Sequence, residues 1–124
     1  MIHLIFCLRR LPHLSREEFQ RYWRETHAPL VRRHAAALGI CRYIQAHTIA
    51  HPVAEAARMA RGAEEEYDGV AELWFDSLEA VMENGARPEA QQAGLMLLED
   101  ERRFIDLEKS PLWWAHEREI VAFR

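Results

Sequence analysis

The sequence predicts an α+β fold in which four short strands form one antiparallel sheet and two helical regions cover one of its faces. Two observations predict it. Apolar stretches of strand length recur near both ends and twice in the middle of the 124-residue chain,. Helix-start patterns occur in two places, and each lies between two of these stretches. The length suits a single domain over residues 1–124,.

Composition narrows the possible partners and compartments. The net charge of −4 is spread along the chain, which argues against a nucleic-acid partner,. No apolar run approaches the ~18 residues of a membrane span, and the first residues do not form a signal peptide,. Cys7 and Cys41 are expected to be free, small core residues of a reducing compartment,. We therefore expect a cytoplasmic protein.

The first half contains a strand, a helical region and a second strand. Residues 2–9 form the first strand, with alternate side chains on opposite faces,. Ser15 and Glu18 form a capping box that starts a helix,. Pro29 is predicted to interrupt this helix just after His27, because proline removes a backbone donor and clashes with the preceding turn,. The helix is then expected to resume and to stop at Gly39,.

Residues 41–48 form the second strand, and residues 51–66 form a solvated loop with a helical turn near 53–60,. After this loop, the second half repeats the order of strand, helical region and strand. Residues 70–76 form the third strand. The capping-box pattern from Asp76 begins a helix that is interrupted near Gly85 and continues from Pro88,. The last strand is expected at residues 119–123.

The order β-α-β-β-α-β is that of the ferredoxin-like fold, which leaves one sheet face without helices. An apolar open face of this kind needs a cover, and the simplest cover is a second copy of the chain. We therefore expect a homodimer with two sheets face to face, and a pocket between sheet and helices. The open face is expected to carry these residues: His3, Ile5, Cys7, Tyr43, Gln45, His47, Val70, Glu72 and Trp74.

Several segments of the sequence resemble the EthD family of the dimeric α/β-barrel superfamily. The segments are residues 11–19, Tyr22-Trp23 with residues 27–30, residues 67–69 leading to 72–75, and Asp100-Glu101 with Phe104. The resemblance covers nearly the whole chain. It implies a homodimer with an apolar, aromatic-lined pocket in each subunit and a histidine of the first helix beside it. Similar proteins include dehydratases, decarboxylases and an isomerase, and the wider superfamily includes cofactor-free monooxygenases and haem-binding members.

His27 is the leading catalytic candidate, because a neutral imidazole near pH 7 can take up and return a proton,. The alternative is a histidine that caps the helix break. Glu72 is either an acid or base with a raised pKa or is paired with an arginine or a histidine, for example in an ion pair with Arg42,. Asp100 either orients His27 or fixes the segment around Phe104. We expect His27 to lie near Glu72 and Trp74.

The remaining candidates are walls of a pocket or alternatives to acid–base chemistry. A metal site of His3, His47 and Glu72 lacks tight ligand spacing, and Cys7 lacks a base that would make it a nucleophile,. Trp113-Trp114 is expected to be a lid or an anchor at the dimer edge. Aromatic and histidine side chains are core residues or, where a pocket exists, its substrate-binding walls. The predicted substrate-binding residues are Tyr22, Trp23, Tyr43, His47, Trp74 and Phe104.

The functional hypotheses span three classes. The first is an enzyme without metal or other cofactor, of isomerase, dehydratase or decarboxylase type, that uses His27 on a small apolar or aromatic oxygenated substrate. The second is a dimer of a catabolic pathway that binds such a molecule without reaction. The third is an oxygenase relative, cofactor-free or haem-using.

Overall fold

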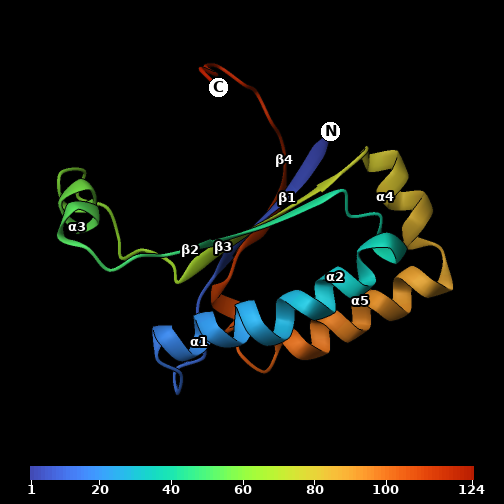
Figure 1. Ribbon diagram of the computed structural model, residues 1–124, viewed down its shortest axis with the longest axis horizontal. Coiled ribbons are helices and arrows are strands. Elements are labelled where there is room, and N and C mark those ends of the chain that lie inside the picture. The colour runs from blue at the N-terminus through green and yellow to red at the C-terminus, as the bar shows by residue number, and fades with distance from the viewer.

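The computed structural model describes residues 1–124 and contains one sheet with helices on one face (Figure 1). The expected β-α-β-β-α-β order is confirmed, with one additional helix, α3, between the second and third strands. In chain order the elements are β1 (Ile2–Leu8), α1 (Arg16–Tyr22), a π-helical turn (Trp23–His27), α2 (Ala28–Leu38), β2 (Arg42–His47), α3 (Pro52–Met59), β3 (Gly69–Phe75), α4 (Leu78–Gly85), α5 (Pro88–Glu101), a 3₁₀ turn (Leu107–Lys109) and β4 (Leu112–His116).

The four strands pair in the order β2-β3-β1-β4, and every neighbouring pair is antiparallel. Helices α1, α2 and α5 lie together under one face, while the chain after β4 leaves the sheet on the other side (Figure 1). This arrangement is the predicted ferredoxin-like α+β fold. No helix is both long enough and apolar enough to span a bilayer.

The register of β2 corrects the predicted composition of the open face. Tyr43 lies opposite Leu73, and Gln45 lies opposite Ala71, so the Tyr43, Gln45 and His47 side chains share the helix-covered face with the core. The prediction failed because β2 alternates without a strongly apolar side, and its pairing decides which set faces inward. The open face instead carries, besides His3, Ile5, Cys7, Val70, Glu72 and Trp74, the residues Arg42, Ile44, Ala46, Trp113 and Ala115.

The first helical region is continuous, so the predicted interruption at Pro29 is wrong. Ser15 caps it with the predicted capping box. Ala28 keeps helical dihedral angles, and its N–H bonds to the carbonyl of Trp23, five residues back. This wider π turn accommodates the proline, which occupies the first turn of α2, where a missing N–H is tolerated,. Gly39 ends the helix in the left-handed conformation, as predicted,.

Two boundaries in the second half also differ from the prediction. The N-cap of α4 is Ser77, whose side chain accepts from the N–H of Ala80, rather than Asp76. The last strand is Leu112–His116, and residues 119–123 form no strand. Both errors have the same cause, because local sequence patterns leave element boundaries uncertain. Residues 119–123 have the apolar pattern of a strand, and Asp76 fits an N-cap as well as Ser77 does,. The helical turn expected near 53–60 is present as α3 (Figure 1).

The main core lies between the sheet and the start of the first helical region. Gly69 allows it to close, because a Cβ there would clash with the Trp23 ring and lie 2.9 Å from the Ala46 carbonyl oxygen. Cys7 is buried as predicted, whereas Cys41 is exposed, and both are free thiols. The core cluster consists of Phe6, Leu8, Phe19, Trp23, Ala71, Phe104 and Ile105.

Candidate active site between the sheet and the helices

An apolar pocket opens between the sheet and helices α2, α4 and α5, on the side where a pocket was expected. Its volume is about 360 Å³, within the range of small-molecule sites. Glu101 is its single ionisable lining residue, and it contains no lysine or arginine. The lining residues are Leu4, Phe6, Leu38, Ile40, Leu73, Phe75, Val81, Asn84, Gly85, Ala90, Gln91, Gly94, Leu97, Glu101, Leu112 and Trp114.

A second, smaller cavity of about 40 Å³ lies deeper, between the same layers. His27, Tyr43 and Glu101 line it, together with apolar side chains. Glu101 belongs to the lining of both spaces. It therefore lies at the boundary between the apolar pocket and the cavity beside the imidazole.

His27 is held from behind by Asp100. The imidazole is buried, and its Nδ1 lies 2.7 Å from Asp100 Oδ2. Asp100 Oδ1 accepts from the Tyr22 hydroxyl at 2.6 Å and from the Arg103 guanidinium at 3.1 Å. The Phe104 ring packs against both His27 and Tyr22. The imidazole orientation is thus fixed by a hydrogen bond and by packing.

The electrostatics of this pair set the imidazole tautomer. Burial opposes ionisation of Asp100, but hydrogen bonds from Tyr22, His27 and Arg103 outweigh it and lower the Asp100 pKa. Burial is also the largest influence on His27; it lowers the pKa of the imidazole despite the attraction of Asp100. A neutral imidazole beside a carboxylate must donate through Nδ1. Nε2, which has no hydrogen-bond partner in the protein, is then an unprotonated base.

Glu101, the next residue, has the opposite environment. Its carboxyl group has no hydrogen bond or ion pair, and burial, followed by the charge of Asp100, raises its pKa to about 7. It is also the last residue of α5, where the helix dipole disfavours negative charge. Two adjacent carboxyl groups thus differ in protonation near neutral pH, a pattern found in acid–base sites.

Tyr43 faces the cavity with its hydroxyl held by a short chain of side chains. The Tyr43 oxygen accepts from the Gln45 amide at 2.8 Å, and the same amide bonds to the Trp23 carbonyl at 3.0 Å. Gln45 Oε1 lies 2.8 Å from His47 Nε2. Because the Tyr43 oxygen acts as the acceptor in this chain, its own proton is free for a ligand. Burial raises the pKa of Tyr43, so the hydroxyl is a neutral donor.

The structure brings most of the predicted site residues together, in different roles. Tyr22 and Phe104 support His27 from behind, while Trp23 and Tyr43 line the cavity with it. His47 packs on Trp23, with ring centroids 4.5 Å apart, and lines neither space. Of the two alternatives for Asp100, contact with His27 is the one that the structure contains.

Glu72 and Trp74 do not join this group, so the expected proximity to His27 is wrong. Both belong to the open face, opposite the helices. There Glu72 Oε1 lies 3.5 Å from His3 Nε2, and Trp74 stacks on His3. Of the expected partners of Glu72, a histidine or an arginine such as Arg42, the structure contains the histidine, and Arg42 lies over the Trp74 ring. Glu72 is therefore removed from the inner cavity by the thickness of the sheet.

The predicted alternative of a metal site also fails on geometry. His47 faces the helices, whereas His3 and Glu72 lie on the open face. No group of three histidine, cysteine, aspartate or glutamate side chains is placed to hold an ion.

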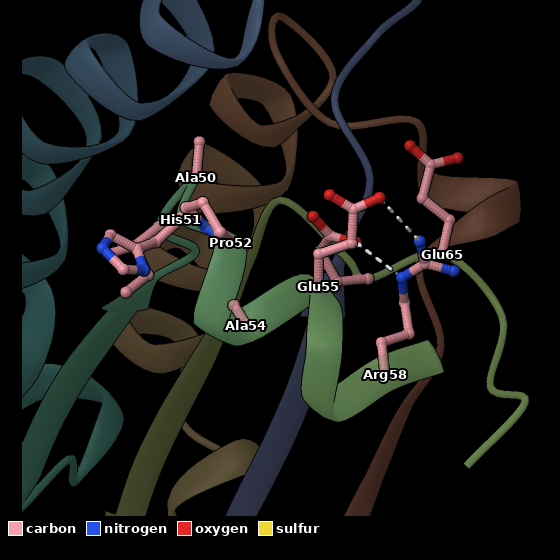
Figure 2. A pocket seen from close by; sticks show the side chains of 9 residues that line it. Ala50, His51, Pro52, Ala54, Glu55, Arg58 and Glu65 are labelled. Atoms are coloured by element: carbon pink, nitrogen blue, oxygen red, sulfur yellow. Dashed lines mark ion pairs between the residues drawn. The ribbon is translucent and has the colours of Figure 1, made fainter. Parts of the chain in front are cut away.

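A wider hollow of about 560 Å³ beside α3 has a different character (Figure 2). Glu55 and Arg58 extend from α3 towards Glu65, and dashed lines mark the ion pairs of the arginine (Figure 2). Arg58 lies 3.8 Å from both Glu55 and Glu66. Charged, exposed and paired side chains of this kind form a solvated surface. We therefore place the candidate site in the apolar pocket.

Sequence reasoning missed Glu101, although a signal for it exists. Ala90, Ala93, Leu97 and Glu101 follow one another at helical spacing, so the glutamate extends the buried stripe of α5,. An acidic residue at the end of an apolar stripe is a candidate for a displaced pKa.

Fold and site together define a ferredoxin-like protein with an apolar pocket between sheet and helices and a histidine–aspartate pair next to it. The profile of the EthD domain matches residues 11–108. The chain therefore belongs to the EthD family, as its motifs predicted.

Similar solved structures agree with this fold. An EthD family protein from Bacillus halodurans is 19% identical with a TM-score of 0.61, covering 95% of this chain and 100% of that one. An EthD-like protein from Ralstonia eutropha is 18% identical with a TM-score of 0.58, covering 99% and 95%. A dimeric ferredoxin-like protein of unknown function from Bacteroides fragilis is 13% identical with a TM-score of 0.57, covering 94% and 95%. No curated protein matches the sequence significantly.

Proposed function

We propose that the protein is a cofactor-independent enzyme that moves protons on a small, apolar or aromatic oxygenated substrate, with His27 as general base and acid. One observation carries this proposal: Asp100 holds Nδ1 of the buried His27 imidazole at 2.7 Å, and the imidazole lines the inner cavity next to the apolar pocket. A base that is unprotonated near neutral pH, and fixed in orientation, meets the main requirement of general base catalysis. The reaction class is that of an isomerase, dehydratase or decarboxylase.

Asp100 is a positioning residue in this proposal, since it acts on the substrate through His27. Tyr22 and Arg103 hold its carboxylate in turn. Trp23 and Tyr43 are walls of the inner cavity, and the pocket beyond it takes the apolar body of the substrate.

The test separates catalysis from simple binding. Small uncharged aromatic ketones and alcohols are screened by thermal stabilisation, where a ligand at 100 times its dissociation constant adds about 2.7 kcal/mol. Proton exchange between each bound ligand and D₂O is then followed by NMR. His27→Ala should abolish exchange and keep binding, while the exposed His13→Ala should change neither. Binding without exchange in the wild-type protein would instead support the non-catalytic alternative.

We also propose that two copies pair through the open sheet face. Ile5, Ile44 and Trp113 give this face an apolar character, and the Bacteroides relative is described as dimeric. Ile44→Asp should shift the sedimentation of a dimer towards the monomer, whereas Leu95→Asp, on the exposed side of α5, should not. A wild-type monomer at micromolar concentration would refute the pairing.

A further inference from the structure

We propose that Glu101 is a second catalytic residue, a proton donor that works opposite His27, and that the substrate is an uncharged ketone with an acidic C–H bond. This inference rests on the proposed function. Its starting point is position, because Glu101 lines both the apolar pocket and the inner cavity that holds His27. Phe6, Leu73 and Leu97 also line both spaces, so Glu101 is the one polar side chain at their shared boundary.

The surroundings of Glu101 favour its neutral, proton-donating form. It has no cationic neighbour and no hydrogen-bond donor, and the lining around it is mostly apolar. The titratable groups that share the inner cavity are His27 and Tyr43, and Asp100 is the adjacent charge. None of them is a cation at neutral pH, so nothing compensates a buried charge on Glu101.

The same lack of cations defines the substrate class. Neither space is lined by lysine or arginine. A substrate carboxylate or phosphate would enter without a counter-charge and close to Glu101, which is costly in an apolar site. The donors that the cavity does offer, the Glu101 carboxyl and the Tyr43 hydroxyl, suit a carbonyl oxygen that gains charge in the transition state.

The reaction step is a proton transfer that balances without an oxidant or a reductant. Nε2 of His27 takes a proton from the carbon next to the carbonyl group. The C–H electron pair becomes the C=C bond of an enol, the carbonyl π pair moves to oxygen, and this oxygen takes the proton of Glu101. Return of a proton from the imidazolium to carbon, and from the enol hydroxyl to Glu101, restores both groups.

The kinetic experiment uses 2-tetralone, an uncharged bicyclic ketone, and follows deuterium incorporation from D₂O next to its carbonyl group by NMR. His27→Ala should abolish enzymic exchange. Loss of the acid in Glu101→Ala should slow it ~100-fold, a typical contribution of general acid catalysis. Glu101→Gln, which keeps shape and a hydrogen-bond donor, should recover part of the rate. Glu83→Gln removes an exposed glutamate of α4 and should leave the rate unchanged.

A second measurement decides the inference without turnover. Carboxyl ¹³C NMR of the wild-type protein should show Glu101 titrating near neutral pH. If Glu101 titrates near its ordinary 4.5, or Glu101→Ala exchanges as fast as wild type while His27→Ala does not, the assignment of Glu101 is overturned and the proposed function stands. If wild type exchanges no faster than His27→Ala, both fail.

Discussion

Asp100→Asn probes the chemistry of the site, because it changes one charge with almost no change in shape. The wild-type carboxylate accepts three hydrogen bonds, at 2.6 Å from Tyr22, 2.7 Å from His27 and 3.1 Å from Arg103. An asparagine keeps one oxygen for Tyr22 and Arg103 and turns its amide towards His27. The amide donates, so Nδ1 must become the acceptor and the proton moves to Nε2. The base that faces the cavity is thereby lost.

The magnitudes follow from these contacts. Hydrogen bonds to a charged group contribute ~1.5–3 kcal/mol and neutral ones ~0.5–1.5 kcal/mol, so we expect the variant to lose about 2 kcal/mol at pH 7. Since folding lowers the Asp100 pKa from its ordinary 3.8, this advantage of the wild type exists above that value and is lost as pH falls through the folded-state pKa. Loss of the general base should slow proton exchange ~10²–10⁴-fold.

Two assays check the reasoning. Imidazole ¹⁵N NMR should show the His27 proton on Nδ1 in the wild type and on Nε2 in Asp100→Asn. Urea unfolding at pH 7 and pH 3 should show the stability difference shrinking at the lower pH, with Glu83→Gln as the control for loss of one carboxylate. A variant whose His27 keeps its proton on Nδ1, or one that exchanges at the wild-type rate, would refute the assignment of Asp100.

The remaining predictions concern the pH dependence and the packing of the site. The rate of proton exchange should rise with pH through the pKa of His27, which lies below its ordinary 6.5, and should fall again above about 7 as Glu101 ionises,. If Glu101→Gln showed the same fall at alkaline pH, this prediction would be contradicted. Glu101 carries a folded-state pKa raised from 4.5 to about 7, so its contribution to stability is lost as pH rises through that interval. At pH 8, Glu101→Gln should therefore have a free energy of unfolding in urea that is higher than that of the wild type by up to about 3 kcal/mol. At pH 4 the two proteins should differ little. Gly69→Ala should destabilise by about 2 kcal/mol or more in thermal unfolding, because its methyl group would clash with Trp23,; an unchanged midpoint would mean that the ring moves freely.

The sequence predicted the strand and helix order because capping and turn signals are local. Ser15 with Glu18, Gly39 and Pro88 each mark a helix boundary that the structure confirms. Pro29 misled because a proline also fits the first turn of a new helix, and a π turn joins the two helices without a break,. Local rules do not distinguish a broken helix from a widened one.

The site was harder to predict, since it depends on which strand face meets which helix. His27 and Asp100 became candidates because their chemistry stands out in any context, and the structure places them in contact. Glu72 lies on the open face as predicted, so only its expected proximity to His27 is wrong. Tyr43, Gln45 and His47 were placed on the wrong face, because sequence alternation alone does not fix the register of β2 against β3,. Once Tyr43 is known to face the helices, Glu72 must face away from them.

The two adjacent carboxyl groups at the end of α5, those of Asp100 and Glu101, differ in their effect on stability. Asp100 is ionised because three donors surround it, and its removal is predicted to weaken the fold. Glu101 is one residue further along and has no partner, so its ionisation is predicted to cost stability near neutral pH,. A glutamine of the same shape would line the pocket without that cost. Packing therefore does not explain a carboxyl group at this position, whereas a proton held opposite the His27 base does.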